Sequence, residues 1–270
     1  MNWPQIQASE RLPVPPEIAR DWPESLFQVD SLRGILVKAL GSTLASAFQP
    51  IFDRHNHHFA DEALLRASVR DKAISPPQAF ASARQGNKLV AFDRLCRTLH
   101  VMNYSSYAQS NRLLFLNVHP ELLVEISDHG AYFEHILSSL GFGPNQVVLE
   151  LLENEAVAVD ASAISRAVKN YRAKGYRIAL DDFGHGMANL DRLWLLEPDF
   201  VKLDRHILAL AAQQDKARQG YAKLVSLLHD AGSQVIAEGV ETQTEKNIAL
   251  DSGVDGLQGF FLARPNYRPL

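Results

Sequence analysis

Short β-rich runs alternate with helical stretches along most of this 270-residue chain, and this alternation constrains the fold more than any other feature. The β-rich runs are expected at residues 48–53, 59–66, 112–118, 146–152, 176–182, 199–204, 233–238 and 255–262. Helical stretches are expected at residues 76–85, 90–108, 120–140, 156–174, 188–196, 205–230 and 242–252. Strands that are apolar on both faces and separated by helices indicate a parallel sheet with helices outside it. The sequence therefore predicts an α/β fold, most economically a (β/α)8 barrel.

The first two β-rich runs depart from this pattern. Only residues 54–58, RHNHH, separate them, which is too short for a crossover helix. We therefore expect an antiparallel hairpin here, and a modified TIM-type (β/α)8 barrel with one antiparallel strand near the N-terminus. Just before it, leucines recur at every fourth position from Leu32 to Leu44, which predicts a helix over residues 31–47.

The first residues have a different character. Five prolines fall within residues 1–24, with little hydrophobic periodicity, so we expect an extended lead-in over residues 1–30 and a barrel domain over residues 31–270. This lead-in is one possible contact for a protein partner.

The composition excludes several classes of protein. The formal net charge is −4, from 27 Lys+Arg and 31 Asp+Glu, so no basic field favours duplex nucleic acid or an anionic membrane. No apolar stretch approaches the roughly 20 residues of a membrane helix, and the N-terminus lacks signal-peptide character. The single cysteine, Cys96, excludes an intrachain disulfide and lies at helical spacing among apolar residues, as a core residue would. We expect a cytoplasmic protein.

Polar side chains follow nearly every predicted strand, at or near its carboxyl end. They are Glu62, Asn117, Glu150, Glu153, Asp181, Asp182, Lys202, Asp204, Glu238, Glu241 and Gln258. Because the carboxyl ends of barrel strands meet at one rim, we expect these side chains to converge there. Any one of them alone could be an isolated rim charge satisfied by water or by an arginine.

The number of acids at this rim has a chemical consequence. Carboxylates within a few ångströms of one another oppose ionisation, and Lys202 with Arg66 cannot neutralise at least five of them. Mg²⁺ and Mn²⁺ select carboxylate and amide oxygens, and the side chain of Asn117 suits the same shell. Two such ions would explain the surplus of acids, and a metal pair of this kind serves hydrolysis of phosphodiesters.

Two other motifs are weaker evidence for a functional site. HNHH at residues 55–58 has metal-binding side chains, but it occupies the hairpin turn opposite the acidic rim, so we expect a solvated turn. GFG at residues 141–143 precedes Pro144 and lacks the context of a phosphate loop, so we expect the end of a helix.

Eight segments together resemble the EAL domain family of cyclic-di-GMP-specific phosphodiesterases over about residues 30–265. They are FQPIFD, DEALLR, FLNVHPELL, LELLENEAV, IALDDFGHG, DFVKLDRHIL, VIAEGVET and QGFFLARP. The resemblance implies a phosphodiesterase, a phosphoric diester hydrolase, that opens cyclic di-GMP to linear pGpG with two Mg²⁺ or Mn²⁺ ions, Ca²⁺ being inhibitory. It also implies a homodimer.

Carried over by position, the resemblance assigns roles to individual residues. The metal ligands fall on Glu62, Asn117, Glu150 and Asp181, with Asp182, Asp204 and Glu238 helping to hold the metals and their water. Lys202 resembles the lysine that orients this water or stabilises negative charge, and with Glu62, Asp182 and Glu238 it makes up the expected catalytic set. Gln49, Arg66, Glu241 and Gln258 are expected to contact substrate, and Glu153 to anchor the loop at residues 183–189.

The chain also departs from the family pattern. The loop reads DFGHGMANL where the family usually has a sequence close to DFGTGYSSL, and Leu152 replaces a common threonine. These changes leave open whether the chain forms the dimer and whether it is fully active. The alternative function is therefore a receptor that binds cyclic di-GMP with weak or no catalysis, or, less favoured, an interaction module that has lost nucleotide binding. No GGDEF half is present in these 270 residues, so cyclase activity is not supported.

Overall fold

The computed structural model describes residues 12, 14–105, 112–119, 129–152, 161–185 and 190–270. The strands within them are β1 (Phe27–Asp30), β2 (Gly34–Ala39), β3 (Ser42–Asp53), β4 (His58–Val69), β5 (Lys72–Ile74), β6 (Leu113–Asn117), β7 (Val147–Leu152), β8 (Arg177–Phe183), β9 (Phe200–Leu203), β10 (Gln234–Ala237) and β11 (Gly256–Leu257). The α-helices are α2 (Pro16–Asp21), α3 (Pro76–Gln85), α4 (Leu89–Ser105), α6 (His129–Ser139), α7 (Ala161–Ala173), α8 (Leu190–Leu196), α9 (Arg205–Gln213), α10 (Asp215–Asp230) and α11 (Gln243–Asp251).

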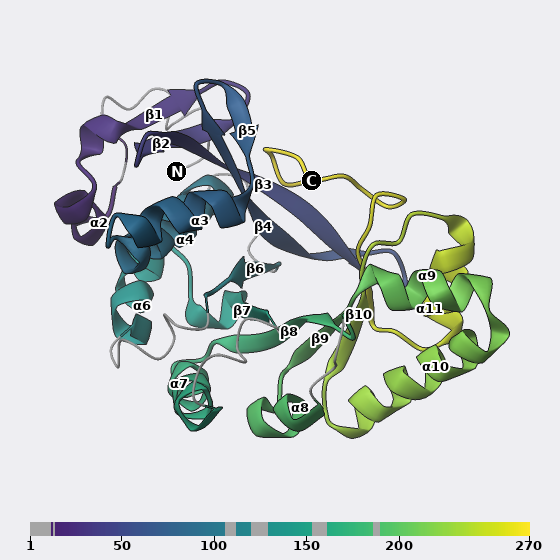
Figure 1. The fold of residues 1–270 in the computed structure, drawn as a ribbon. Helices are drawn as coiled ribbons and strands as arrows, with labels where there is room; N and C mark the ends of the chain where they lie inside the picture. Colours follow the sequence, from purple (N-terminus) through teal and green to yellow (C-terminus); the bar gives the residue numbers. More distant parts are fainter. Residues whose placement is uncertain (1–11, 13, 106–111, 120–128, 153–160, 186–189) are drawn as a thin grey trace.

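Within the described residues, eight strands close into a barrel in the order β3-β11-β10-β9-β8-β7-β6-β4, and β4 pairs back with β3. Strand β3 is antiparallel to both of its barrel neighbours, whereas the other neighbouring strands are parallel. Helices α7 to α11 lie outside the barrel strands (Figure 1). The predicted TIM-type barrel with one reversed strand near the N-terminus is therefore confirmed.

The helix predicted over residues 31–47 is wrong, because this segment forms β2 and the beginning of β3. Leu40 (φ 50°) and Gly41 (φ 76°) make the tight turn between the strands, and Val37 then pairs with Leu44. A spacing of four places leucines on one face of a strand as well as on one face of a helix, because four is a multiple of two. Strands β1, β2 and β5 extend the sheet beyond the barrel (Figure 1).

The expectation of an extended lead-in is also wrong for the described part of residues 1–30. Helix α2 begins with Pro16 at a position where the missing amide hydrogen costs no hydrogen bond. It packs against α4, with Ile18 buried, and the indole Nε1 of Trp22 donates a hydrogen bond of 3.1 Å to the carbonyl of Ala91. The division of the chain into residues 1–30 and 31–270 stays a prediction.

Local signals set several other boundaries. Ser75 caps α3 by accepting a hydrogen bond from the backbone N–H of Gln78, whose side chain accepts one from Ser75 in return. The single helix expected over residues 205–230 is instead two helices, because Gln214 is extended (φ −137°, ψ 126°) between α9 and α10. The expected strand at residues 255–262 is shorter, since β11 ends at Leu257.

Cys96 and the two motifs GFG and HNHH have structural roles. Cys96 is buried on α4, and Gly141 has a positive φ of 78° just after α6, as expected of a helix end. The histidine-rich turn precedes β4, and His57 Nδ1 lies 3.0 Å from Asp53 Oδ2 there, at hydrogen-bond distance. Within the described residues, we find no helix that combines the length and the apolar composition of a membrane span.

Candidate active site

The barrel interior has an apolar layer directly below a polar one. On six strands, a buried apolar residue is followed two positions later by a polar residue, five of them within the strand and Glu238 directly after β10. The pairs are Ala60 and Glu62, Phe115 and Asn117, Val148 and Glu150, Ala179 and Asp181, Phe200 and Lys202, and Ile236 and Glu238. Because the parallel strands are aligned, the six polar side chains meet at the carboxyl end of the barrel, as the sequence predicts.

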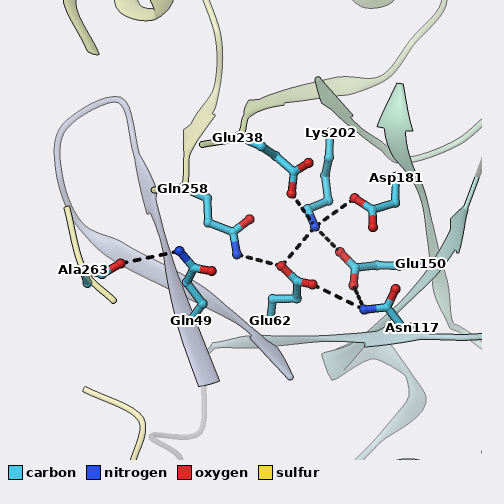
Figure 2. Close-up of polar contacts among 9 residues, drawn as sticks. All are labelled: Gln49, Glu62, Asn117, Glu150, Asp181, Lys202, Glu238, Gln258 and Ala263. Carbon is cyan, nitrogen blue, oxygen red and sulfur yellow. Dashed lines mark hydrogen bonds and ion pairs between the residues drawn. The ribbon is translucent and has the colours of Figure 1, made fainter. Parts of the chain in front are cut away.

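Lys202 lies at the centre of this polar layer (Figure 2). Its Nζ is 2.7 Å from Glu150 Oε1, 2.7 Å from Glu238 Oε1, 3.0 Å from Asp181 Oδ1 and 3.2 Å from Glu62 Oε2. Burial by itself lowers the pKa of Lys202, but the four carboxylates overcome this effect and raise the pKa well above its ordinary value. The four carboxylates therefore favour the charged form of Lys202, although it is completely buried.

Glu62 is held by two amide side chains in addition to Lys202. Gln258 Nε2 donates to Glu62 Oε2 at 2.7 Å, and Asn117 Nδ2 donates to Glu62 Oε1 at 3.3 Å (Figure 2). Asn117 also donates to Glu150 Oε2 at 3.1 Å. Gln49 lies on the other side of Gln258 and donates to the carbonyl of Ala263 at 3.5 Å. The contacts from Lys202, Gln258 and Asn117 fix the orientation of the Glu62 carboxylate.

One lysine cannot balance the four carboxylates that surround it. Burial raises the pKa values of Glu150, Asp181 and Glu238, against the opposing effect of Lys202. Arg66 adds no cation to this cluster, because its guanidinium donates to the carbonyl of Leu65 at 3.2 Å and the structure places no carboxylate of the cluster within ion-pair distance of it. The surplus of carboxyl groups over cations predicted from the sequence is therefore present, and their raised pKa values oppose ionisation until a further cation binds.

The carboxylates fit two divalent cations. Oxygen atoms of Glu62, Glu150 and Asp181 lie within 4.8 Å of one another, and so do those of Asp181, Asp182 and Glu238. Glu150 Oε1 and Asp181 Oδ1 are buried and face Lys202 without any aligned hydrogen bond in the described part of the molecule. Carboxylate oxygens are the donors that Mg²⁺ and Mn²⁺ prefer. Asp181 is common to both groups, so two ions held there would share it.

Asp182 offers an oxygen to the same group as its neighbour Asp181, although adjacent residues of a regular strand point to opposite faces, and the backbone departs from regular strand geometry there. Its φ is 56°, and the register between β8 and β9 shifts between Leu180 and Phe183. Asp182 is half-buried, and burial raises its pKa to about 6, with further contributions from the charges of Asp181 and Asp204. Two adjacent acids at the end of one strand can therefore both reach the second group, while Asp181 alone also belongs to the first.

Two cavities flank Glu62. One, of about 210 Å³, is lined by Gln49, Glu62, Asp182, Asp204, Arg205, Glu238, Gly239, Glu241, Gln258, Gly259 and Phe260. The other, of about 490 Å³, lies between β4, α3 and α4, and its lining includes Glu62, Arg66, Phe80, His100 and Asn117. The side chains expected to contact substrate are thus divided, with Arg66 in the larger cavity and the other three in the smaller one.

Most of the residues predicted from the sequence come together at this mouth. Arg66 lines the larger cavity instead. Glu153 lies outside the described residues, as do residues 186–189 of the loop it was expected to anchor. Sequence reasoning missed Arg205, which follows Asp204 and makes an ion pair of 3.3 Å with Glu241. It also missed Gly239 (φ 60°), where an added Cβ would collide with the side chain of Arg205. The signal available was the glycine directly after a strand-end acid in AEGVE.

Comparisons with known proteins show the family to which the sequence is similar. Residues 34–265 match the EAL domain as a protein family. The cyclic di-GMP phosphodiesterase PdeL of Escherichia coli (strain K12) is 28% identical over 210 residues, which cover 76% of this chain and 57% of PdeL. The cyclic di-GMP phosphodiesterase RocR of Pseudomonas aeruginosa is 28% identical over 212 residues, covering 76% of this chain and 52% of RocR.

A solved structure extends the likeness to the fold. The manganese and cyclic di-GMP complex of Klebsiella pneumoniae BlrP1 at pH 6 is 27% identical to this chain, with a TM-score of 0.72, over 83% of this chain and 56% of BlrP1. The chain spans little more than half the length of PdeL, RocR and BlrP1, and about a quarter of the signaling protein YkoW of Bacillus subtilis, which it also matches.

Proposed function

The chain belongs to the EAL domain family, and from this premise we propose that it hydrolyses cyclic di-GMP to linear pGpG with the help of Mg²⁺ or Mn²⁺. The observation that carries the proposal is the buried cluster in which Lys202 contacts Glu62, Glu150, Asp181 and Glu238. Such a cluster has an excess of carboxylates that divalent cations would balance. A barrel that only bound a partner would gain nothing from this arrangement, which costs desolvation.

The two cation positions share Asp181 in this proposal. Glu62, Asn117, Glu150 and Asp181 would hold one ion, and Asp181, Asp182 and Glu238 with Asp204 would hold the other. Asn117 would present its amide oxygen after a half-turn of the amide group, which now donates to two carboxylates. When bound, the ions supply a nucleophilic water at neutral pH and offset the charge on the leaving oxygen.

The protein side chains orient the reacting groups and supply positive charge. Lys202 is a buried cation at the centre of the cluster, so it is suited to hold the attacking water in place and to stabilise negative charge that develops at phosphorus. Gln258 and Asn117 orient the Glu62 carboxylate. In this proposal Arg66 would donate two hydrogen bonds to one phosphate from the larger cavity, and Gln49, Glu241 and Gln258, which line the smaller cavity, would contact the rest of the dinucleotide.

Chromatography of cyclic di-GMP incubated with the full chain and Mg²⁺ tests this function. We expect pGpG to accumulate, and the Glu62→Gln variant, which keeps the shape of the side chain, to produce none. Binding without product would favour the alternative function, a receptor for cyclic di-GMP. Calorimetry in Ca²⁺ separates that case from an interaction module, since only the receptor would bind the nucleotide. The homodimer, the protein partner of the N-terminal segment and the cytoplasmic location stay predictions.

A further inference from the structure

Phe260 is an aromatic residue that stays exposed at the mouth of the barrel. It lies in the turn after β11 and is 48% exposed. Exposure alone means little, because single exposed apolar residues are common on proteins. Phe260, however, is the one aromatic side chain in the described lining of the smaller cavity, where it lies with Glu62 and Gln258. None of the substrate contacts expected from the sequence is aromatic.

The backbone on both sides of Phe260 is fixed by contacts with Val240. The N–H of Phe261 donates a hydrogen bond of 3.0 Å to the carbonyl of Val240, and the N–H of Val240 donates one of 3.0 Å to the carbonyl of Gln258. Gly259 packs so closely on this segment that an added Cβ would collide with the backbone of Val240. The chain therefore holds Phe260 in place before any ligand arrives, and such preorganisation lowers the entropy that binding costs.

The ring of Phe260 is oriented by Arg264. The guanidinium carbon of Arg264 lies 4.4 Å from the centre of the ring, in a cation–π contact. A cation above a ring covers one of its two faces, and Arg264 is not part of the cavity lining. The opposite face of the ring is therefore the one that a ligand in the smaller cavity can cover.

A nucleobase is the part of a nucleotide that suits this ring. Bases are flat, and they stack on aromatic side chains in proteins that bind single-stranded nucleic acids. The smaller cavity, of about 210 Å³, is below the roughly 300–1,000 Å³ of sites that enclose a whole drug-sized ligand. It therefore has room for one base rather than for a whole dinucleotide.

We propose that Phe260 is the surface on which one guanine base of cyclic di-GMP stacks, with Arg264 supporting the other face of the ring. This inference rests on the proposed function, because it assumes that cyclic di-GMP is the ligand. Stacking uses the face of a base and not its hydrogen-bonding edge. Phe260 therefore contributes affinity, and it helps to align the dinucleotide over the acids beside it.

Calorimetry of the full chain with cyclic di-GMP in Ca²⁺ tests this proposal. Phe260→Ala should weaken binding by about 5- to 150-fold, the usual loss when a stacked base loses its aromatic partner. Phe260→Trp keeps an aromatic face and should retain the affinity. The added indole should also lose fluorescence when cyclic di-GMP binds, measured against the wild type, and a purely structural role for Phe260 would not produce this signal.

The next residue offers a matched control. Phe261 is 42% exposed but is not part of the cavity lining, so Phe261→Ala should bind cyclic di-GMP as the wild type does. Circular dichroism checks that each variant folds. Unchanged binding in Phe260→Ala, or an equal loss in Phe261→Ala, would overturn the inference and leave the proposed function standing. If the wild type neither bound nor cleaved cyclic di-GMP, the proposed function would fail and this inference with it.

Discussion

The ammonium group of Lys202 lies 2.7 Å from the carboxylate of Glu150, and both residues are completely buried in the barrel. The contact is one of four that the lysine makes with carboxylates from four other strands. The lysine is the charge that allows the metal-free protein to keep these acids together, and its removal should therefore affect folding as well as activity.

Lys202→Met should lower the free energy of unfolding of the metal-free protein by about 3–5 kcal/mol, the usual cost of leaving buried charges without their partner. Urea denaturation in the presence of a chelator measures this change. Lys223→Met, at an exposed position on α10, is the matched control and should change stability little. Equal stabilities of the two variants would show that Lys202 does not stabilise the cluster.

The pH dependence of the metal-free protein should reflect the raised pKa of Asp182. Because this pKa rises from 3.8 to about 6 on folding, the folded protein binds the proton more tightly than the unfolded chain does. The carboxyl group therefore contributes its full stability below pH 4 and loses it as pH rises through about 6. Asp182→Asn should flatten the stability profile between about pH 4 and 6, measured by urea denaturation. An identical slope in wild type and variant would contradict this assignment.

Gly239→Ala should destabilise the protein by about 1–3 kcal/mol, because φ is 60° there and the new methyl group would collide with the stem of Arg205. Gly220→Ala is the matched control. Gly220 lies inside α10 with no atom within 4 Å of an added Cβ, so alanine should stabilise the helix by about 0.5–1 kcal/mol. Thermal denaturation of both variants measures the difference. A change in stability of the same sign in both variants would contradict the prediction.

Trp22→Ala should destabilise the protein by about 3–5 kcal/mol, since the indole is only 4% exposed and donates a hydrogen bond to Ala91. Trp194→Ala, at a position that is 56% exposed on α8, should have little effect on the stability of the single chain. Chemical denaturation followed by circular dichroism compares the two. Little loss for Trp22→Ala would mean that the N-terminal segment is the loose lead-in expected from its prolines.

The sequence was enough to predict the barrel and most of its acidic mouth. Alternation along a strand places Phe200 and Lys202 on one face, and parallel alignment brings the ends of neighbouring strands together. The leucines of residues 31–47 were misread because their spacing fits two periodicities, and only the turn at Leu40 and Gly41 distinguishes them.

Other features depend on contacts between distant segments, which leave no local pattern. The approach of Gly239 to Arg205 joins the ends of β10 and β9, and the packing of Trp22 on Ala91 joins residues 69 positions apart. The position of Lys202 among four carboxylates likewise depends on the closure of the barrel, which brings their strands around it. Periodicity predicts the face on which a residue lies, but not the partner it meets there.

Anomalous diffraction from crystals grown with Mn²⁺ tests most directly whether cations balance the acidic mouth. We expect one peak among Glu62, Glu150 and Asp181, and a second among Asp181, Asp182 and Glu238. Crystals in which the mouth shows no anomalous density at saturating Mn²⁺, with Lys202 alone among its carboxylates, would contradict the account.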